Sequence, residues 1–272
     1  MDTPVQTNSS AMAFGWRAYG LGVMAIGVVC LAWRDFEPGE AVPTNLPDRV
    51  VLACIADLLV IVASAAVLWR RSAAWGAAAL AVYFGVFVVV LMNGQVILAN
   101  YTVYGAYSSC AEELALAAAG VIVYARFAAI DAVVHARITR ASQVTFGVCA
   151  VLFGGAHFFY MNLTAPLVPK WLPPSQVFWG YATGVFHIAA GVAILAGVQA
   201  RLATILLTIM YASFTPLVHV PILLGDHASY FNWTENALNL ALTGAAWAVA
   251  DSLGRQKVGG SIFFGKKEAK NF

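Results

Sequence analysis

AWGAAALAVYFGVFVVVLM, residues 74–92, contains no charged side chain and no proline. A helix of about 20 apolar residues crosses the roughly 30 Å hydrocarbon core of a bilayer, so this stretch predicts a membrane-spanning helix. Similar apolar runs recur along the chain, in which only 10% of the residues are charged. Soluble domains carry about 25% charged residues. The sequence therefore predicts an all-α, polytopic membrane protein that contacts membrane lipid, and nothing in it indicates nucleic-acid binding.

Eight candidate membrane-spanning helices follow from these runs. They cover residues 14–33, 49–69, 74–98, 109–127, 142–161, 175–198, 201–224 and 232–252. The first is expected to be an uncleaved span, because no small-residue cleavage site follows it before Arg34.

The basic residues predict the orientation of these spans. Twelve of the fifteen Lys and Arg side chains fall on one side of the predicted helices, and only Arg34, Arg49 and Lys170 fall on the other. Cytoplasmic loops carry an excess of Lys and Arg. We therefore expect a bacterial inner-membrane protein with both termini in the cytoplasm.

The two halves of the chain contain a weak internal repeat. Pro43–Pro47 (PTNLP) matches Pro169–Pro173 (PKWLP) at an offset of 126, and Glu112 matches Glu235 at an offset of 123. Because each copy holds an even number of spans, the two four-helix bundles are expected to be parallel rather than inverted. The predicted divisions are a polar N-terminal tail (1–13), repeat one (14–130), a cytoplasmic linker (131–141), repeat two (142–253) and a basic C-terminal tail (254–272).

The second half also resembles a known family. Ala156-His157, the elbow VPKWLP at Val168–Pro173, and the helical segment from Thr183-Gly184 through Leu195 resemble the motifs of the DoxX-like small membrane proteins. His187 stands where the family carries a glutamate. The resemblance implies a four-helix bundle in this half and a role beside thiol, sulfur or quinone oxidoreductases, with a redox enzyme as protein partner. The N-terminal half is then a diverged second copy.

Polar side chains inside the spans are the candidate site residues, because ionisable groups in a membrane are costly to bury and are usually functional. His157, His187, His219 and Glu235 lie in the second half, and Glu112 is the first-half equivalent of Glu235. Most of these side chains are expected in the outer half of the membrane. Imidazoles and buried carboxyl groups suit a quinone, whose carbonyl oxygens need hydrogen bonds and protons.

Three other interpretations remain open at this point. A metal or haem site would use His157, His187 and His219, although no two of them have the i, i+4 spacing of ligands on one helix. A non-catalytic scaffold or assembly factor would use the same polar groups only to join helices. A small-molecule transporter is the third alternative. The glycine- and alanine-rich helices allow close packing, including contact with a second copy of the chain. The four cysteines contain no CxxC motif; a Cys30–Cys54 disulfide and four free thiols are the alternatives, and the second is favoured.

Overall fold

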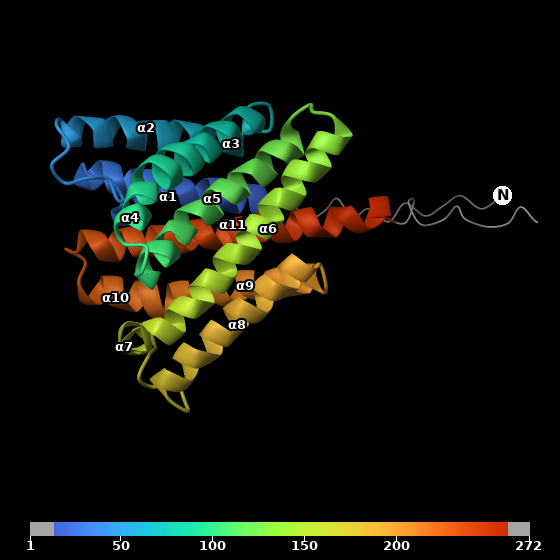
Figure 1. The fold of residues 1–272 in the computed structure, drawn as a ribbon. Coiled ribbons are helices and arrows are strands. Elements are labelled where there is room, and N and C mark those ends of the chain that lie inside the picture. Colours follow the sequence, from blue (N-terminus) through green and yellow to red (C-terminus); the bar gives the residue numbers. More distant parts are fainter. Residues whose placement is uncertain (1–13, 261–272) are drawn as a thin grey trace, which may run out of the picture.

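The computed structural model describes the backbone of residues 14–260 and the side chains of residues 14–254. All regular structure in these residues is helical (Figure 1). The long α-helices of the first half are α1 (Gly15–Trp33), α2 (Arg49–Leu68), α3 (Ala73–Val82) and α5 (Tyr104–Phe127). Those of the second half are α6 (Ala132–Phe159), α8 (Gln176–Ala196), α9 (Ala200–Phe214) and α11 (Tyr230–Gly260).

Short helices complete the chain. They are the 3₁₀ turns η2 (Pro38–Glu40) and η4 (Ala165–Leu167), the α-helices α4 (Gly94–Ala99), α7 (Met161–Thr164) and α10 (Val220–Gly225), and the π-helices η3 (Tyr83–Asn93) and η5 (Thr215–His219). The π-helices join α3 to α4 and α9 to α10, so that residues 73–99 and 200–225 each form one continuous helix with a widened segment.

Seven of the helices in the described residues are long and apolar enough to cross a membrane. They agree with the first seven predicted spans, with ends that differ by up to about ten residues. The predicted linker 131–141 is an exception, because residues 132–141 form the first turns of α6. Asp131 caps this helix: its carboxylate accepts hydrogen bonds from the amides of Val133 and Val134, at 2.8 and 3.2 Å. The predicted tail is helical up to Gly260, and residues 261–272 lie outside the described part.

The helices run back and forth between two ends of the bundle (Figure 1). We call the end at which α1 begins and α11 ends the proximal end, and the opposite one the distal end. At the distal end lie the loops 34–48, 100–103, 160–175 and 226–229. The elbow that contains Val168–Pro174 belongs to the distal end, where Ser175 caps α8 by accepting a hydrogen bond from the amide of Phe178 at 3.1 Å.

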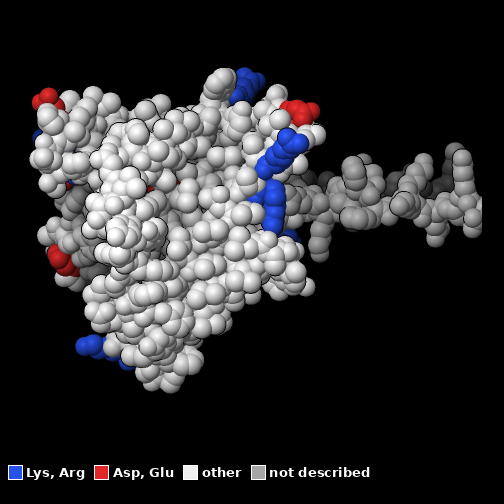
Figure 2. All heavy atoms as spheres, viewed as in Figure 1, with Lys and Arg blue, Asp and Glu red and all other residues white. Residues whose placement is uncertain are grey.

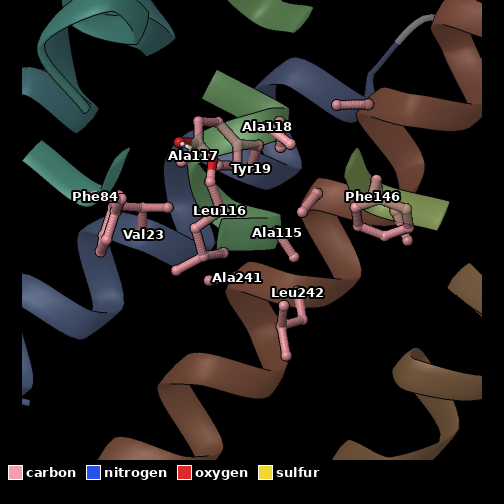
Figure 3. Packing of buried hydrophobic residues seen from close by; sticks show 14 of the residues in the cluster. Tyr19, Val23, Phe84, Ala115, Leu116, Ala117, Ala118, Phe146, Ala241 and Leu242 are labelled. Carbon is pink, nitrogen blue, oxygen red and sulfur yellow. Dashed lines mark hydrogen bonds between the residues drawn. The ribbon is translucent and has the colours of Figure 1, made fainter. Parts of the chain in front are cut away.

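The centre of the bundle is a close contact between α1 and α11. A Cβ atom added to Gly244 would lie 2.3 Å from the backbone nitrogen of Tyr19, and one added to Gly22 would lie 2.5 Å from the Cα of Ala241. Small residues therefore set the distance between these helices. The fully buried Tyr19 donates a hydrogen bond to the carbonyl oxygen of Leu116 in α5 at 3.0 Å (Figure 3).

The remaining contacts close two groups of four helices. In the first half α1 packs on α2, α2 on α3, and α3 on α5; in the second half α6 packs on α8, α8 on α9, and α9 on α11. The halves meet where α1 and α5 of the first contact α11 and α6 of the second. This junction positions the polar side chains described next.

Candidate functional site

All five side chains singled out in the sequence line one cavity of about 210 Å³ in the distal half of the bundle. Each comes from a different helix: Glu112 from α5, His157 from α6, His187 from α8, His219 from η5 and Glu235 from α11. We call this space the histidine cavity. Its wall also holds the apolar side chains Phe153, Ala156, Phe214, Leu238 and Leu242. The cavity is thus formed mainly by the second half and closed by α5 of the first.

Thr183 of α8 anchors two of the three imidazole rings. Nδ1 of His187 lies 2.8 Å from the carbonyl oxygen of Thr183, which only accepts, so this nitrogen carries the proton. Nδ1 of His157 lies 3.1 Å from the Thr183 hydroxyl, which itself donates to the carbonyl oxygens of Trp179 and Gly180. His157 is therefore also assigned as the Nδ1–H tautomer. In both neutral rings Nε2 is left as a hydrogen-bond acceptor.

The two anchored rings lie beside each other and beside a tyrosine. The ring centroids of His157 and His187 are 5.3 Å apart, and those of His187 and Tyr211 are 5.4 Å apart. Tyr211 is buried, and its hydroxyl group has no hydrogen-bond partner among the described residues. Leaving a buried hydroxyl unpaired costs about 1–3 kcal/mol. The cavity thus offers a donor that a bound group would satisfy.

The other polar side chains of the wall differ in how they are held. Asn239 donates to the carbonyl oxygen of Tyr211 at 3.1 Å and to the hydroxyl of Thr215 at 2.9 Å, which ties α11 to the helix formed by residues 200–225. By contrast, His219, Glu112 and Glu235 make no hydrogen bond to any other side chain or backbone group described. These three groups are available to a ligand.

A second cavity, of about 480 Å³, adjoins the first. Glu112 and Glu235 line both cavities, and Glu37 supplies a third carboxyl group to the second. The wall also contains Asn93 and Asn100, and no Lys, Arg or His side chain. We call this space the acidic cavity.

The 34–48 loop brings two of its own carboxyl groups into the bundle. Phe36 and Val42 pack on Ala53 of α2, and this contact carries the segment between them inward. Glu37 and Glu40 are consequently only 3% and 4% exposed. Glu37 accepts a hydrogen bond from the amide of Gly39 at 2.5 Å, which starts the 3₁₀ turn η2.

Burial shifts the ionisation of both loop carboxyl groups. Loss of hydration raises the pKa of Glu37 to about 7, with a further contribution from the nearby charge of Glu235. It also raises the pKa of Glu40 well above its ordinary value, although the Tyr83 hydroxyl donates to Glu40 at 2.8 Å. Glu113 of α5 lies behind them, 1% exposed, with its carboxyl group beside that of Glu37.

Sequence reasoning did not find Glu37, Tyr211 or Thr183 as site residues. The loop that holds Glu37 reads as a solvated acidic connection between two spans, and only the apolar Phe36 and Val42 on either side signal that it folds inward. Tyr211 and Thr183 lie in apolar stretches and carry no charge. Thr183 had a signal, since it is one helical turn before His187 and thus lies on the same face of α8.

Comparison with known protein families finds a match in the second half of the chain. Residues 146–250 match a family described as a domain of unknown function (DUF8561). No curated protein and no solved structure matches the chain. The matched segment contains all three cavity histidines and Glu235, whereas Glu112 lies outside it.

The chemistry available to the histidine cavity is hydrogen bonding and proton exchange beside apolar walls. Among the described residues no group of three or more His, Cys, Asp or Glu side chains is placed to hold a metal ion. All four cysteines are free thiols. The cavity presents a hydroxyl donor on Tyr211, acceptor nitrogens on His157 and His187, and two carboxyl groups.

Proposed function

We propose that the chain is an eight-span membrane protein, with α11 as the eighth span. At 31 residues α11 is longer than the roughly 20 that a bilayer requires. Its composition is less apolar than that of the other seven because it lies between α1, α5 and α9, where the buried Thr234, Asn239 and Ser252 face protein rather than lipid.

We further propose that the two halves are parallel repeats. Three kinds of observation support this: both halves have the same order of packed neighbours, both have a π-helix in the third helix, and both form a cavity. At the offset of 123 that relates Glu112 to Glu235, Val96 in the acidic cavity corresponds to His219 in the histidine cavity. At the same offset Ser108 in the histidine cavity corresponds to Phe231 in the acidic cavity.

The proposed location is a bacterial inner membrane, with the proximal end in the cytoplasm. In Figure 2 most of the visible Lys and Arg side chains lie near the proximal end, and a smaller number lie at the distal end. The positive-inside rule assigns the end with the excess of basic residues to the cytoplasm. Both cavities then lie toward the outer leaflet.

Within this membrane we propose that the protein binds the headgroup of a quinone in the histidine cavity. The observation that carries the proposal is the convergence of three imidazoles, two carboxyl groups and an unpaired tyrosine hydroxyl on one cavity with apolar walls. A quinone carbonyl accepts from a donor such as Tyr211, whereas a quinol hydroxyl donates to an acceptor such as Nε2 of His187. A cavity of about 150 Å³ accommodates benzene, so 210 Å³ suits one substituted ring.

A quinone site within the helical bundle fits the membrane subunit or anchor of a redox complex. The DoxX-like motifs at Ala156-His157 and Val168–Pro173 support a sulfur- or thiol-related partner enzyme. The glycine-rich helices are also compatible with a homo-oligomer.

The test is to purify the full chain from its native membrane and to measure the bound quinone and any co-purifying protein by mass spectrometry. His219→Leu removes a cavity side chain that forms no hydrogen bond with any described residue. His227→Leu is the matched control on the exposed distal surface. Retained quinone that is lost in the first variant and kept in the second is the expected result. A correctly folded protein that carries only bulk lipid would contradict the proposal.

A scaffold or assembly factor is the alternative. The hydrogen bonds of Asn239 to Tyr211 and Thr215 favour it, because they join helices without a ligand. A purely structural role does not account for His219, Glu112 and Glu235, which bond to no neighbouring helix. Loss of folding or assembly, rather than of bound quinone, in His219→Leu would decide for the scaffold.

A further inference from the structure

Quinone binding leaves the acidic cavity without a role. At about 480 Å³ it is larger than the histidine cavity and lies within the range of about 300–1,000 Å³ typical of small-molecule sites. Its carboxyl groups belong to Glu37, Glu112 and Glu235. Arg49, at the start of α2, does not line the cavity and forms an ion pair with Asp35 at 2.7 Å.

Two deeply buried side chains, Asn93 and Glu37, supply acceptor oxygens at this cavity. Asn93 is 2% exposed and lines the cavity; its amide nitrogen donates to the carbonyl oxygen of Gly39 at 3.0 Å, but no described group donates to its amide oxygen. Glu37 is 3% exposed and uses one carboxylate oxygen for the amide of Gly39. The Glu37 carboxyl group also lies within hydrogen-bonding reach of the Glu113 carboxyl group.

Glu113 adds a further acceptor directly behind the wall. Both of its carboxyl oxygens are buried, and among the described residues only the Glu37 carboxyl group reaches them. The two carboxyl groups of Glu37 and Glu113 flank Gly39: a Cβ atom added there would lie 2.8 Å from Oε2 of Glu37 and 3.0 Å from Oε1 of Glu113. Acceptors thus outnumber donors on this side of the cavity.

We propose that the acidic cavity binds a small organic cation that carries a protonated primary or secondary amine. An ammonium group supplies positive charge to Glu37 and Glu235 and an N–H donor to the amide oxygen of Asn93. Charge-assisted hydrogen bonds of this kind are the strongest that side chains make. The volume favours an organic cation over a bare metal ion, because one ion and its ligands would leave most of 480 Å³ empty.

The ionisation of the loop supports this assignment. Burial and the charge of Glu235 raise the pKa of Glu37 to about 7, and the other acidic groups that face it are Glu113 and Glu40. A cation bound among these carboxyl groups would favour their charged forms. Amine binding is therefore expected to strengthen as the pH rises from 6 to 8.

The experiment uses the full chain in lipid nanodiscs at pH 8 and follows thermal unfolding and tryptophan fluorescence during titration with putrescine. Tetramethylammonium has the charge but no N–H donor, and NaCl at equal ionic strength controls for screening. Putrescine alone is expected to raise the unfolding temperature, and Glu37→Gln is expected to weaken its binding about tenfold or more. Asp226→Asn removes an exposed acid at the same distal end and is expected to change nothing.

Two results would overturn the amine site. One is the absence of a shift with putrescine in the wild-type chain; the other is an equal shift with tetramethylammonium or NaCl. His219→Leu separates this proposal from the quinone proposal, because His219 lines only the histidine cavity whereas Glu37 lines only the acidic cavity. We expect the His219→Leu variant to bind amine as the wild-type chain does, whether or not the histidine cavity holds a quinone.

Discussion

Glu112 of α5 and Glu235 of α11 lie in the wall that the two cavities share, although 123 positions separate them in the chain. The same two residues are related by the offset of 123 of the proposed repeat. Two carboxylates that face the same cavity repel each other, so the charge on one affects the other. A ligand bound in either cavity is therefore expected to change the protonation of the two carboxyl groups, and with it ligand binding in the other cavity.

Substitution of the shared carboxyl groups should affect both cavities. We expect Glu235→Gln to alter both quinone retention and putrescine binding, whereas Glu37→Gln alters only the latter. Because Glu112 and Glu235 interact, the double variant Glu112→Gln/Glu235→Gln should differ from the sum of the single variants. Binding isotherms for both ligands in all four proteins measure this coupling. Effects of Glu235→Gln confined to one cavity would refute the shared wall.

The threonine anchor gives a spectroscopic prediction. In Thr183→Val the hydroxyl partner of His157 is lost, but the carbonyl partner of His187 remains. Nitrogen-15 NMR of labelled histidine should find the Nδ1–H tautomer for both rings in the wild-type chain and a change at His157 alone in the variant. Stability should fall by about 1 kcal/mol. Thr208→Val is the control, since the Thr208 hydroxyl bonds only to its own helix. A wild-type Nε2–H signal for His187 would refute the anchor.

Packing of α1 on α11 predicts a strong glycine effect. Gly244→Ala would place a methyl group 2.3 Å from the backbone nitrogen of Tyr19, so the helices must separate. Overpacking of this kind costs about 1–3 kcal/mol or more. Unfolding in increasing SDS should detect the loss. Gly225→Ala, where an added Cβ atom meets nothing within 4 Å, should leave the transition unchanged. Equal stability of the two variants would contradict the close contact.

The buried loop predicts a pH dependence of stability. Glu37 has a pKa of about 7 in the folded chain and about 4.5 when hydrated, so the folded state holds the extra proton between these values. Stability from this group is fully present below pH 4.5 and is lost as the pH rises through 7, by about 1–3 kcal/mol. Denaturation curves from pH 4.5 to 8 should be flatter for Glu37→Gln than for the wild-type chain. Identical slopes would show that Glu37 is hydrated.

Hydropathy alone predicted seven helices well, because each must present an apolar surface of fixed length. It also indicated the cavity residues, since polar groups such as His187 stand out against apolar neighbours. The sequence therefore predicts how deep a side chain lies along its helix, but not the direction in which the side chain faces. That Glu112 and Glu235 meet depends on how α5 and α11 are rotated, which packing decides.

Two features were beyond the sequence for physical reasons. The π-helices at Tyr83–Asn93 and Thr215–His219 change the hydrogen-bond register without changing hydropathy, so an apolar pattern conceals them. Acidic loops are generally expected to be hydrated, but the carboxyl groups of Glu37 and Glu40 are buried. Contacts of Phe36 and Val42 with α2 override this expectation.

The most direct test of quinone binding in the histidine cavity is photolabelling. The purified full chain is irradiated with an azido-substituted benzoquinone, with and without excess unlabelled quinone, and the modified peptides are mapped by mass spectrometry. We predict competed labelling around Tyr211 and His219, with weaker labelling near His157 and His187. Labelling confined to the exposed faces of α2 and α3, or unaffected by excess quinone, would contradict quinone binding at this site.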